Sequence, residues 1–372
     1  MIRVAKTRMF LFLTLFLGLH PFLLGIDHLV GIEGSILTEI AQIELQGKPV
    51  QMQIDHAQDY AYITDYDKRV VRVVDLRTLE LAFSLTQSNY PVFVSFSQDY
   101  VMVSDFWGHK VDFYIRGTSL LDFSVPTPRG PGYSVYHKGL LYVTTQLEHQ
   151  LIVIDPDAQK VAQSFPLIGR VPKFSIFESL VILPYYDNYH TWSRDFELEH
   201  SIHLMNLSTL HRWNIDGVSK KPLHILPIDT GVYALSGYLD QGIWIARWGN
   251  QSVEALAQWT GHTHIMDICV FGDMIVIPSM SNNRLQLVRL STGSVDSVPS
   301  ATGILALANY EDRYLFALSN FHNLLQVYHD GFQLKEEHRT GDYPIAMAIH
   351  GAQLLVVSMD RAILQVFQIN NP

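Results

Sequence analysis

The feature that most constrains the fold is an apolar run that recurs about every forty residues. Eight copies end at residues 65, 105, 145, 185, 236, 279, 319 and 358, with intervals of 40, 40, 40, 51, 43, 40 and 39. After a short polar turn each run is followed by a second apolar run, as in "AYITDYDKRVVRVVDL" (61–76). Self-similarity at a fixed period of this length is typical of propellers, solenoids and other repeat architectures.

Two further runs complete each unit. One precedes each copy and often opens with proline, as in "PVQMQID" (49–55), "PVFVSFS" (91–97) and "PKFSIFE" (172–178). Proline fits the first residue of a strand, where its missing N–H costs little. A more polar run closes the unit, as in "ELAFSLT" (80–86). We name the four runs strands a, b, c and d, and their regular repetition predicts a β-propeller of four-stranded antiparallel blades.

The two ends of the repeat array predict how the ring closes. The last unit stops at its strand c, "ILQVFQI" (363–369), whereas "LTEIAQIEL" (37–45) has no a, b or c run before it. If residues 37–45 supply the missing strand d by pairing with 363–369, no sheet edge is left exposed. We therefore expect residues 34–372 to form one all-β domain, an eight-bladed propeller.

The first 25 residues differ from the rest of the chain. "MIRVAKTR" is basic, and "MFLFLTLFLGLHPFLLG" (9–25) is almost entirely apolar. This order is typical of a secretory signal peptide, with an uncleaved N-terminal anchor as the alternative. Either reading predicts an extracytoplasmic protein, in the periplasm, at the cell surface or secreted. Only an uncleaved segment would attach it to a membrane.

Two stretches carry a family resemblance. "AYITDYDKRVVRVVDLRTLE" (61–80) and "LLYVTTQLEHQLIVIDPDAQKV" (140–161) resemble the repeats of the YVTN and LVIVD propeller families. These families consist of secreted or cell-surface proteins of bacteria and archaea. The resemblance implies an extracytoplasmic propeller used for binding or as a scaffold, and it implies no specific ligand.

Propeller geometry predicts where a binding site lies. The b–c turns and the d–a connections meet at one mouth of the central channel, and loops held by a rigid scaffold commonly carry function. The interval of 51 places a long insertion in one b–c turn, "YDNYHTWSRDFELEH" (186–200). Aromatic and arginine side chains are enriched at binding hot spots. The predicted binding residues are Tyr186, Asp187, Tyr189, His190, Trp192 and Arg194 of this insertion, with Lys48, Trp107, His109, Arg129, Arg170 and Tyr238 from neighbouring loops.

The charges at this mouth allow two interpretations. Lys48, Arg129 and Arg170 belong to a partly cationic ring that could hold an anionic ligand. Asp65 and Asp105 stand close by in the sequence, so ion pairs could instead neutralise the ring. A metal site has only the weak support of two histidines two residues apart, His262 and His264.

Composition and motifs narrow the function. The net charge of −10 argues against a nucleic-acid binder, which needs a surplus of lysine and arginine. No nucleophile elbow or phosphate-binding loop occurs, and no cofactor is indicated. The sequence favours a binding or scaffold protein of the cell envelope, with a protein partner or a small or anionic ligand at one face. Two alternatives stay open, an enzyme or redox-enzyme subunit that uses the channel as its pocket, and a purely structural surface protein.

Overall fold

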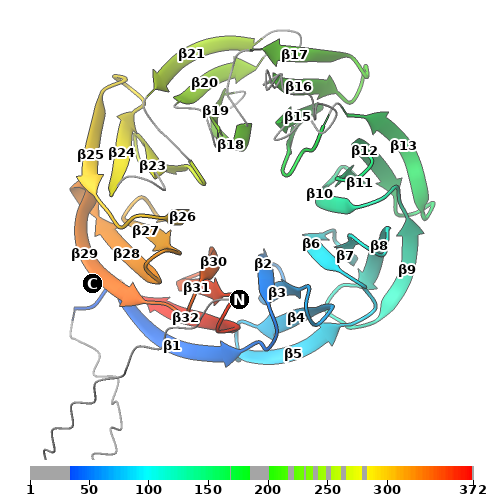
Figure 1. The fold of residues 1–372 in the computed structure, drawn as a ribbon, viewed down its shortest axis with the longest axis horizontal. Helices are drawn as coiled ribbons and strands as arrows, with labels where there is room; N and C mark the ends of the chain where they lie inside the picture. Colours follow the sequence, from blue (N-terminus) through cyan, green and yellow to red (C-terminus); the bar gives the residue numbers. More distant parts are fainter. Residues whose placement is uncertain are drawn as a thin grey trace, which may run out of the picture. The chain divides into compact units, whose positions relative to one another are not determined.

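A computed structural model confirms the eight-bladed β-propeller. The structure describes residues 34–370, except 168, 185–200, 217–221, 230–231, 238–241, 249–252, 261–264 and 279–282. Within these residues the strands form eight separate four-stranded antiparallel sheets. The sheets stand side by side in a ring, with strand a innermost and strand d outermost (Figure 1).

The first four blades follow the predicted repeat. Blade 1 contains β2 (Pro49–Asp55), β3 (Tyr60–Asp65), β4 (Val70–Asp75) and β5 (Glu80–Leu85). Blade 2 contains β6 (Pro91–Phe96), β7 (Tyr100–Asp105), β8 (Lys110–Ile115) and β9 (Leu121–Pro126). Blade 3 contains β10 (Pro131–His137), β11 (Leu140–Thr145), β12 (Gln150–Asp155) and β13 (Lys160–Pro166). Blade 4 contains β14 (Ser175–Phe177), β15 (Leu180–Pro184), β16 (Ser201–Asn206) and β17 (Arg212–Asp216).

The remaining blades repeat this order. Blade 5 contains β18 (Pro222–Asp229), β19 (Val232–Gly237), β20 (Gly242–Trp248) and β21 (Val253–Thr260). Blade 6 contains β22 (Cys269–Phe271), β23 (Met274–Pro278), β24 (Arg284–Arg289) and β25 (Val295–Pro299). Blade 7 contains β26 (Ile304–Tyr310), β27 (Tyr314–Ser319), β28 (Leu324–His329), the 3₁₀ turn η1 (Asp330–Phe332) and β29 (Gln333–Arg339).

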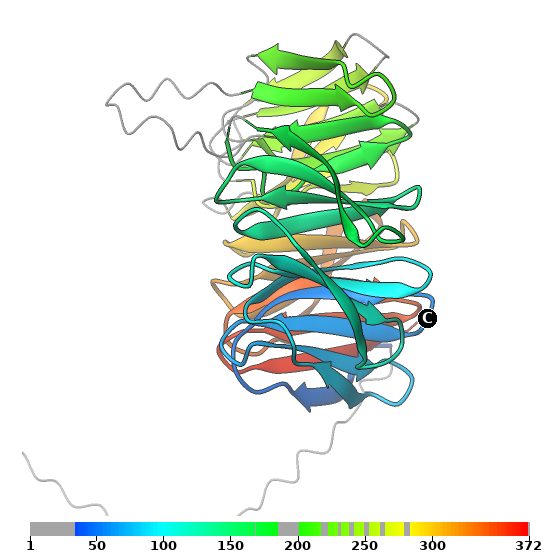
Figure 2. The same cartoon turned by 90° about the vertical axis from the view of Figure 1, so that its right-hand side faces the viewer.

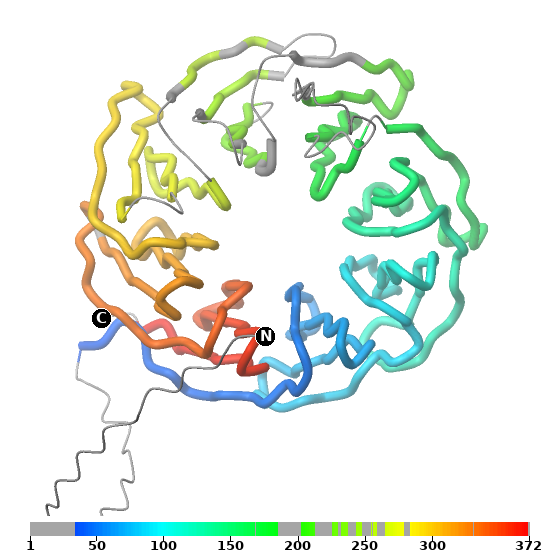
Figure 3. Tube along the Cα trace, viewed as in Figure 1, coloured from blue at the N-terminus to red at the C-terminus, as the bar shows by residue number. Residues whose placement is uncertain are grey.

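Blade 8 is built from both ends of the repeat array. Its strands are β30 (Pro344–His350), β31 (Gln353–Ser358), β32 (Ile363–Ile369) and β1 (Leu37–Glu44), with β1 as the outer strand. β1 pairs antiparallel with β32, from Leu37 opposite Ile369 to Glu44 opposite Ile363. The chain trace shows the two segments side by side, β1 in blue and β32 in red (Figure 3). This is the pairing that the incomplete last repeat predicts.

Strand a carries a recurrent irregularity. In blades 1 and 2 the opening proline pairs with the last residue of strand b, and one extra residue follows before the ladder resumes at Gln51 and Phe93. Such a β-bulge reverses which face the next side chains occupy. In blade 4 the expected strand over 172–178 is shorter than predicted, because β14 covers only Ser175–Phe177. Pro172 and Lys173 therefore lie outside the sheet and extend the lining of the channel.

The hydrophobic core lies between neighbouring blades. Tyr62, Val71 and Val73 of blade 1, for example, pack against Val94 and Tyr114 of blade 2. Each such layer removes apolar surface from water and fixes the angle between two sheets.

A buried ion pair joins the same two blades. The guanidinium of Arg116 donates two hydrogen bonds to Asp55, whose side chain is fully buried, with Nε 2.7 Å from Oδ2. Bidentate arginine–carboxylate pairs of this kind are geometrically specific. The directional hydrogen bonds of this pair therefore fix the orientation of blade 2 relative to blade 1, in addition to the packing of their apolar side chains.

Viewed from the side, the strands cross the thickness of the ring and the turns lie at its two faces (Figure 2). We call the face that carries the b–c turns and the d–a connections the b–c face. Backbone hydrogen bonds tie these two kinds of loop together, as from Phe106 N to Tyr90 O (2.9 Å) and from Gln146 N to Gly130 O (2.7 Å). Among the described residues, no helix is long and apolar enough to cross a membrane.

Candidate functional site

The b–c turns share one backbone design. In blades 1, 2, 3, 7 and 8 the turn has four residues, and its last residue has a positive φ, as in Arg69 (56°), His109 (53°) and Asn323 (52°). The left-handed region is uncommon for residues with a side chain, and asparagine and histidine tolerate it better than most. His109 thus contributes to the turn, and its Nδ1 lies 3.0 Å from the Phe106 carbonyl oxygen.

The aspartates that end strand b hold the loops of this face together. Asp105 is fully buried and accepts hydrogen bonds from three backbone N–H groups, those of Asn89 (2.7 Å), Tyr90 (2.7 Å) and Gly108 (2.9 Å). Asp65 similarly accepts from the N–H groups of Lys48 (3.1 Å) and Lys68 (3.0 Å). A carboxylate that takes several backbone donors is a strong structural element.

Of the Asp65 and Asp105 carboxylates, only that of Asp65 also lies near a cation among the described residues, with its Oδ2 4.0 Å from an Nη of Arg72 on β4. Both carboxylates accept their hydrogen bonds from backbone N–H groups. Arg129 nevertheless has a partner, because its Nε lies 2.9 Å from Glu148 Oε1. Lys48 is exposed and Arg170 is half-buried. Lys68, in the b–c turn of blade 1, also has an acidic neighbour, with its Nζ 3.7 Å from Asp67 Oδ2, so this face combines cations with carboxylates.

An aromatic cluster occupies the part of this face over blades 1 and 2. Its members are Tyr66, Tyr90, Phe106, Trp107 and His109. Ring centroids lie 5.4 Å apart for Tyr66 and Tyr90, and 4.9 Å apart for Phe106 and Trp107. Trp107 also lies 6.5 Å from Tyr90 and 6.4 Å from His109. We call this group the aromatic cluster.

The aromatic cluster presents its largest ring to solvent. Trp107 is 53% exposed, although the residues before and after its turn are held rigidly. Large aromatic side chains lose little conformational entropy on binding and bury a large area. The sequence analysis predicted Trp107 and His109 as binding residues but not Tyr66 or Phe106. A sequence signal for these two was available, because in blades 1 and 2 an aromatic residue directly follows the aspartate that ends strand b.

A cavity of about 690 Å³ lies on the channel wall next to the aromatic cluster. Its walls come from the inner strands β2, β6 and β10 and from the segment before β14. Tyr66 and Tyr90 line it at the b–c face, so the cavity opens at the mouth where the sequence placed the site. Its other side chains include Gln51, Gln53, Phe93, Tyr133 and Lys173.

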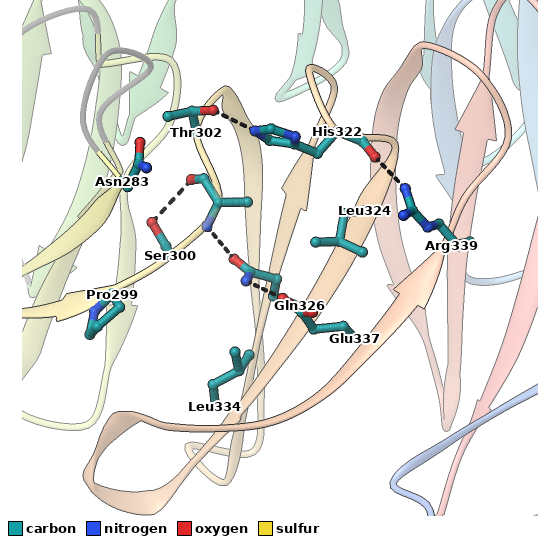
Figure 4. Close-up of a pocket in the computed structure, with 11 residues that line it drawn as sticks. Asn283, Pro299, Ser300, Thr302, His322, Leu324, Gln326, Leu334, Glu337 and Arg339 are labelled. Carbon is teal, nitrogen blue, oxygen red and sulfur yellow. Dashed lines mark hydrogen bonds between the residues drawn. The ribbon is translucent and has the colours of Figure 1, made fainter.

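A second cavity, of about 490 Å³, lies between blades 6 and 7 on the same face (Figure 4). Many of the polar groups that line it form hydrogen bonds with one another. Thr302 Oγ1 lies 2.6 Å from His322 Nε2, and Gln326 accepts from Ala301 N and donates to Glu337. Gln365 makes the same two kinds of contact in blade 8, accepting from Gly341 N and donating to Glu39. This recurrence indicates that the second cavity is mainly an inter-blade joint.

The remaining predicted site residues lie outside the described residues. They are Tyr186, Asp187, Tyr189, His190, Trp192, Arg194 and Tyr238, together with the weak metal candidates His262 and His264. Among the described residues, no group of three or more His, Cys, Asp or Glu side chains is placed to hold a metal ion.

Two titratable groups near blade 6 have shifted pKa values. Burial raises the pKa of Asp267 to about 6, against the opposing effects of hydrogen bonds from Leu307 N and Ile268 N and of the charge of Lys173. Burial, with the charges of Asp267 and Asp312, raises the pKa of the Cys269 thiol to about 12. Because only a thiolate is nucleophilic, this cysteine is unreactive near neutral pH.

Comparisons with known proteins show the fold and no family. No family model matches this chain, and no curated protein sequence matches it. The resemblance to the YVTN and LVIVD families is therefore not confirmed.

Solved structures match nearly the whole chain. Sqt1 from Saccharomyces cerevisiae matches with a TM-score of 0.73 at 12% identity, over 90% of this chain and 99% of that one. BamB from Moraxella catarrhalis matches with a TM-score of 0.70 at 11% identity, over 91% and 99%. The computationally designed protein Ika8 matches with a TM-score of 0.66 at 13% identity, over 88% and 99%. At these identities the likeness shows a shared propeller fold alone.

Proposed function

We propose that this protein is an exported binding or scaffold protein that holds a partner at its b–c face. The observation that carries the proposal is the half-exposed ring of Trp107, set in a turn that the buried Asp105 carboxylate keeps rigid. An exposed aromatic side chain on a preorganised loop binds at a low entropic cost.

The rest of the face supports a recognition surface. Two other large aromatic side chains are exposed there, Phe321 (60%) in the b–c turn of blade 7 and Tyr343 (45%) in the connection to blade 8. Large exposed rings spaced around a ring of loops provide several anchor points for a protein partner. The opposite face has no comparable aromatic among the exposed residues that the structure describes.

The alternative of an enzyme needs titratable groups that converge in a pocket. Among the described residues, the shifted pair of Asp267 and Cys269 includes a thiol whose pKa of about 12 keeps it protonated. The channel cavity next to the aromatic cluster is lined by tyrosine, phenylalanine and glutamine with one lysine. This composition fits binding better than proton transfer.

Capture of partners with tagged protein tests the proposed surface. We expect wild-type protein to retain specific envelope proteins that the variant Trp107→Ser loses. Leu120→Ser is the matched control, because Leu120 is 61% exposed in the same blade but lies in the c–d turn at the opposite face. If both variants lost the same proteins, or if neither lost any, the proposal that the b–c face around Trp107 binds a partner would be refuted.

Export is tested separately by cell fractionation. We propose that residues 1–25 direct the chain out of the cytoplasm, on the basis of their basic start and apolar run. A reporter that is active only outside the cytoplasm, fused after residue 34, should be active. Replacing Leu13 and Leu15 with arginine should abolish that activity, and an active reporter in this variant would contradict export by this segment.

A further inference from the structure

The channel cavity next to the aromatic cluster has features of a small-molecule site. Its volume of about 690 Å³ falls within the range of about 300–1,000 Å³ that is usual for ligand pockets. Three blades and the segment before β14 contribute to its wall, so its shape depends on the assembled ring. Gln51, Phe93 and Tyr133 stand on inner strands, which position binding groups more accurately than loops do, whereas Tyr66, Tyr90 and Lys173 lie in connecting segments.

Aromatic rings form two parts of the lining. Phe93 and Tyr133 lie with their centroids 4.4 Å apart on adjacent inner strands, and Tyr66 and Tyr90 lie 5.4 Å apart at the mouth. The rings of each pair are tilted, by 52° for Phe93 and Tyr133 and by 31° for Tyr66 and Tyr90, and they give the cavity an aromatic lining. A six-membered ligand ring, aromatic or saturated, would pack against one of these side chains by its face or its edge.

A residue of the cavity wall carries an unsatisfied polar atom. The side-chain oxygen of Gln51 is buried and has no hydrogen-bond partner among the described residues. Buried acceptors are nearly always satisfied, so each exception calls for an explanation. Rotation of the Gln51 side chain would bring this oxygen to the cavity surface, where a ligand hydroxyl would supply the missing hydrogen bond.

The cavity also contains a single cation. Lys173 lies just before β14, is exposed, and forms no ion pair within 4.0 Å with any residue that the structure describes. Its charge acts electrostatically on Asp267. A carboxylate on the ligand would provide the contact partner that the lysine lacks among the described residues.

We infer that this cavity binds a hydroxylated six-membered-ring carboxylate, with the ring on the aromatic side chains, a hydroxyl on Gln51 and the carboxylate on Lys173. Two sources share this chemistry, a sugar acid and a hydroxylated aromatic acid. The inference rests on the proposed function and deepens it, by giving the b–c face a ligand class besides a protein partner.

Calorimetric titration at low salt tests the inference with four probes. D-glucuronate and 4-hydroxybenzoate carry the proposed groups on a saturated and an aromatic ring, and D-glucose and phenol are their uncharged counterparts. At least one acid should bind with a dissociation constant near or below about 1 mM, and at least tenfold more tightly than its uncharged counterpart. The acid that binds identifies the source. No binding of either acid up to roughly 10 mM would overturn the inference.

Two variants examine the named contacts. Lys173→Met should weaken binding of the acid at least tenfold, whereas Lys335→Met, on the outer strand β29, should leave it unchanged. Gln51→Leu should weaken binding without loss of stability, because it removes an unsatisfied buried group. Equal affinity in wild type and Lys173→Met would overturn the inference. Since Trp107 does not line the cavity, titration and partner capture with Trp107→Ser can fail independently.

Discussion

Replacing Asp105 with alanine should be among the most damaging single changes at the b–c face. The substitution removes the carboxylate that accepts the N–H groups of Asn89, Tyr90 and Gly108, at 2.7, 2.7 and 2.9 Å. A hydrogen bond to a charged group contributes about 1.5–3 kcal/mol net, so three of them set an upper limit of about 5–9 kcal/mol.

Two effects lower that limit. Water can reach part of this face, and the cost of burying a carboxylate disappears together with its hydrogen bonds. We therefore expect Asp105→Ala to lower the free energy of unfolding by about 3–5 kcal/mol, a large share of the 5–15 kcal/mol that is typical of a domain.

The repeat itself supplies a milder variant. Ser319 ends strand b of blade 7, where its hydroxyl accepts from His322 N (3.2 Å) and donates to Thr302 O (2.6 Å). Asp105→Ser should therefore restore part of the lost stability, leaving a deficit of about 2 kcal/mol. The matched control is Asp75→Ala, since Asp75 accepts from two backbone N–H groups in the c–d turn at the opposite face. That change should cost about 1 kcal/mol, like the loss of an ordinary cap.

Urea unfolding followed by circular dichroism measures these differences. Hydrogen–deuterium exchange of peptides covering residues 86–92 and 106–110 locates them. In Asp105→Ala both segments should exchange faster, while the c–d turns stay protected. If Asp105→Ala were no more destabilising than Asp75→Ala, or if exchange rose evenly over the ring, the assignment of Asp105 as the element that holds these loops would be refuted.

Three further predictions concern the ring. Removing residues 1–46 should prevent folding, whereas removing residues 1–33 should not. The reason is that four buried apolar side chains of segment 36–45 contribute about 6–12 kcal/mol to stability in total. A normal cooperative melt of the chain that lacks residues 1–46 would contradict this prediction. Arg116→Met should cost about 3–5 kcal/mol by leaving the buried Asp55 carboxylate unpaired, and adding Asp55→Asn should recover part of the loss in a double-mutant cycle. Burial raises the pKa of Asp267 to about 6, so the folded state binds that proton more tightly than the unfolded chain. Between about pH 7 and pH 4 the free energy of unfolding of the wild type should therefore rise by up to about 3 kcal/mol relative to that of Asp267→Asn. A difference in urea midpoint between the two proteins that does not change with pH would refute this prediction.

Most of the fold could be predicted from the sequence because the repeat carries it. β6 begins at Pro91 and ends one residue before the expected end at 97, and β1 pairs with β32 as the incomplete last unit predicts. Alternating apolar residues, opening prolines and regular turns all act locally, so a single sequence displays them.

The site was harder to predict because bulges reverse the alternation of side chains. An extra residue follows Pro49 and Pro91. If side chains are assigned to alternate faces of the strand by counting from the proline, those that line the channel are therefore placed on the wrong face. Gln51, Phe93 and Tyr133 each stand two residues after an opening proline, and this shared register was the available signal for the cavity. The role of Asp105 was also missed, because the sequence cannot show that its partners are backbone N–H groups.

The composite blade 8 also determines the order in which this protein can mature. A nascent chain can stack blades 1 to 7 as they are synthesised, but β1 stays without its neighbour until β32, more than three hundred residues later, has left the ribosome. Contacts between such distant segments form slowly. Throughout that interval the first strand presents an unpaired backbone edge to every other chain nearby. A circular permutant that joins β32 directly to β1 should therefore fold faster and aggregate less.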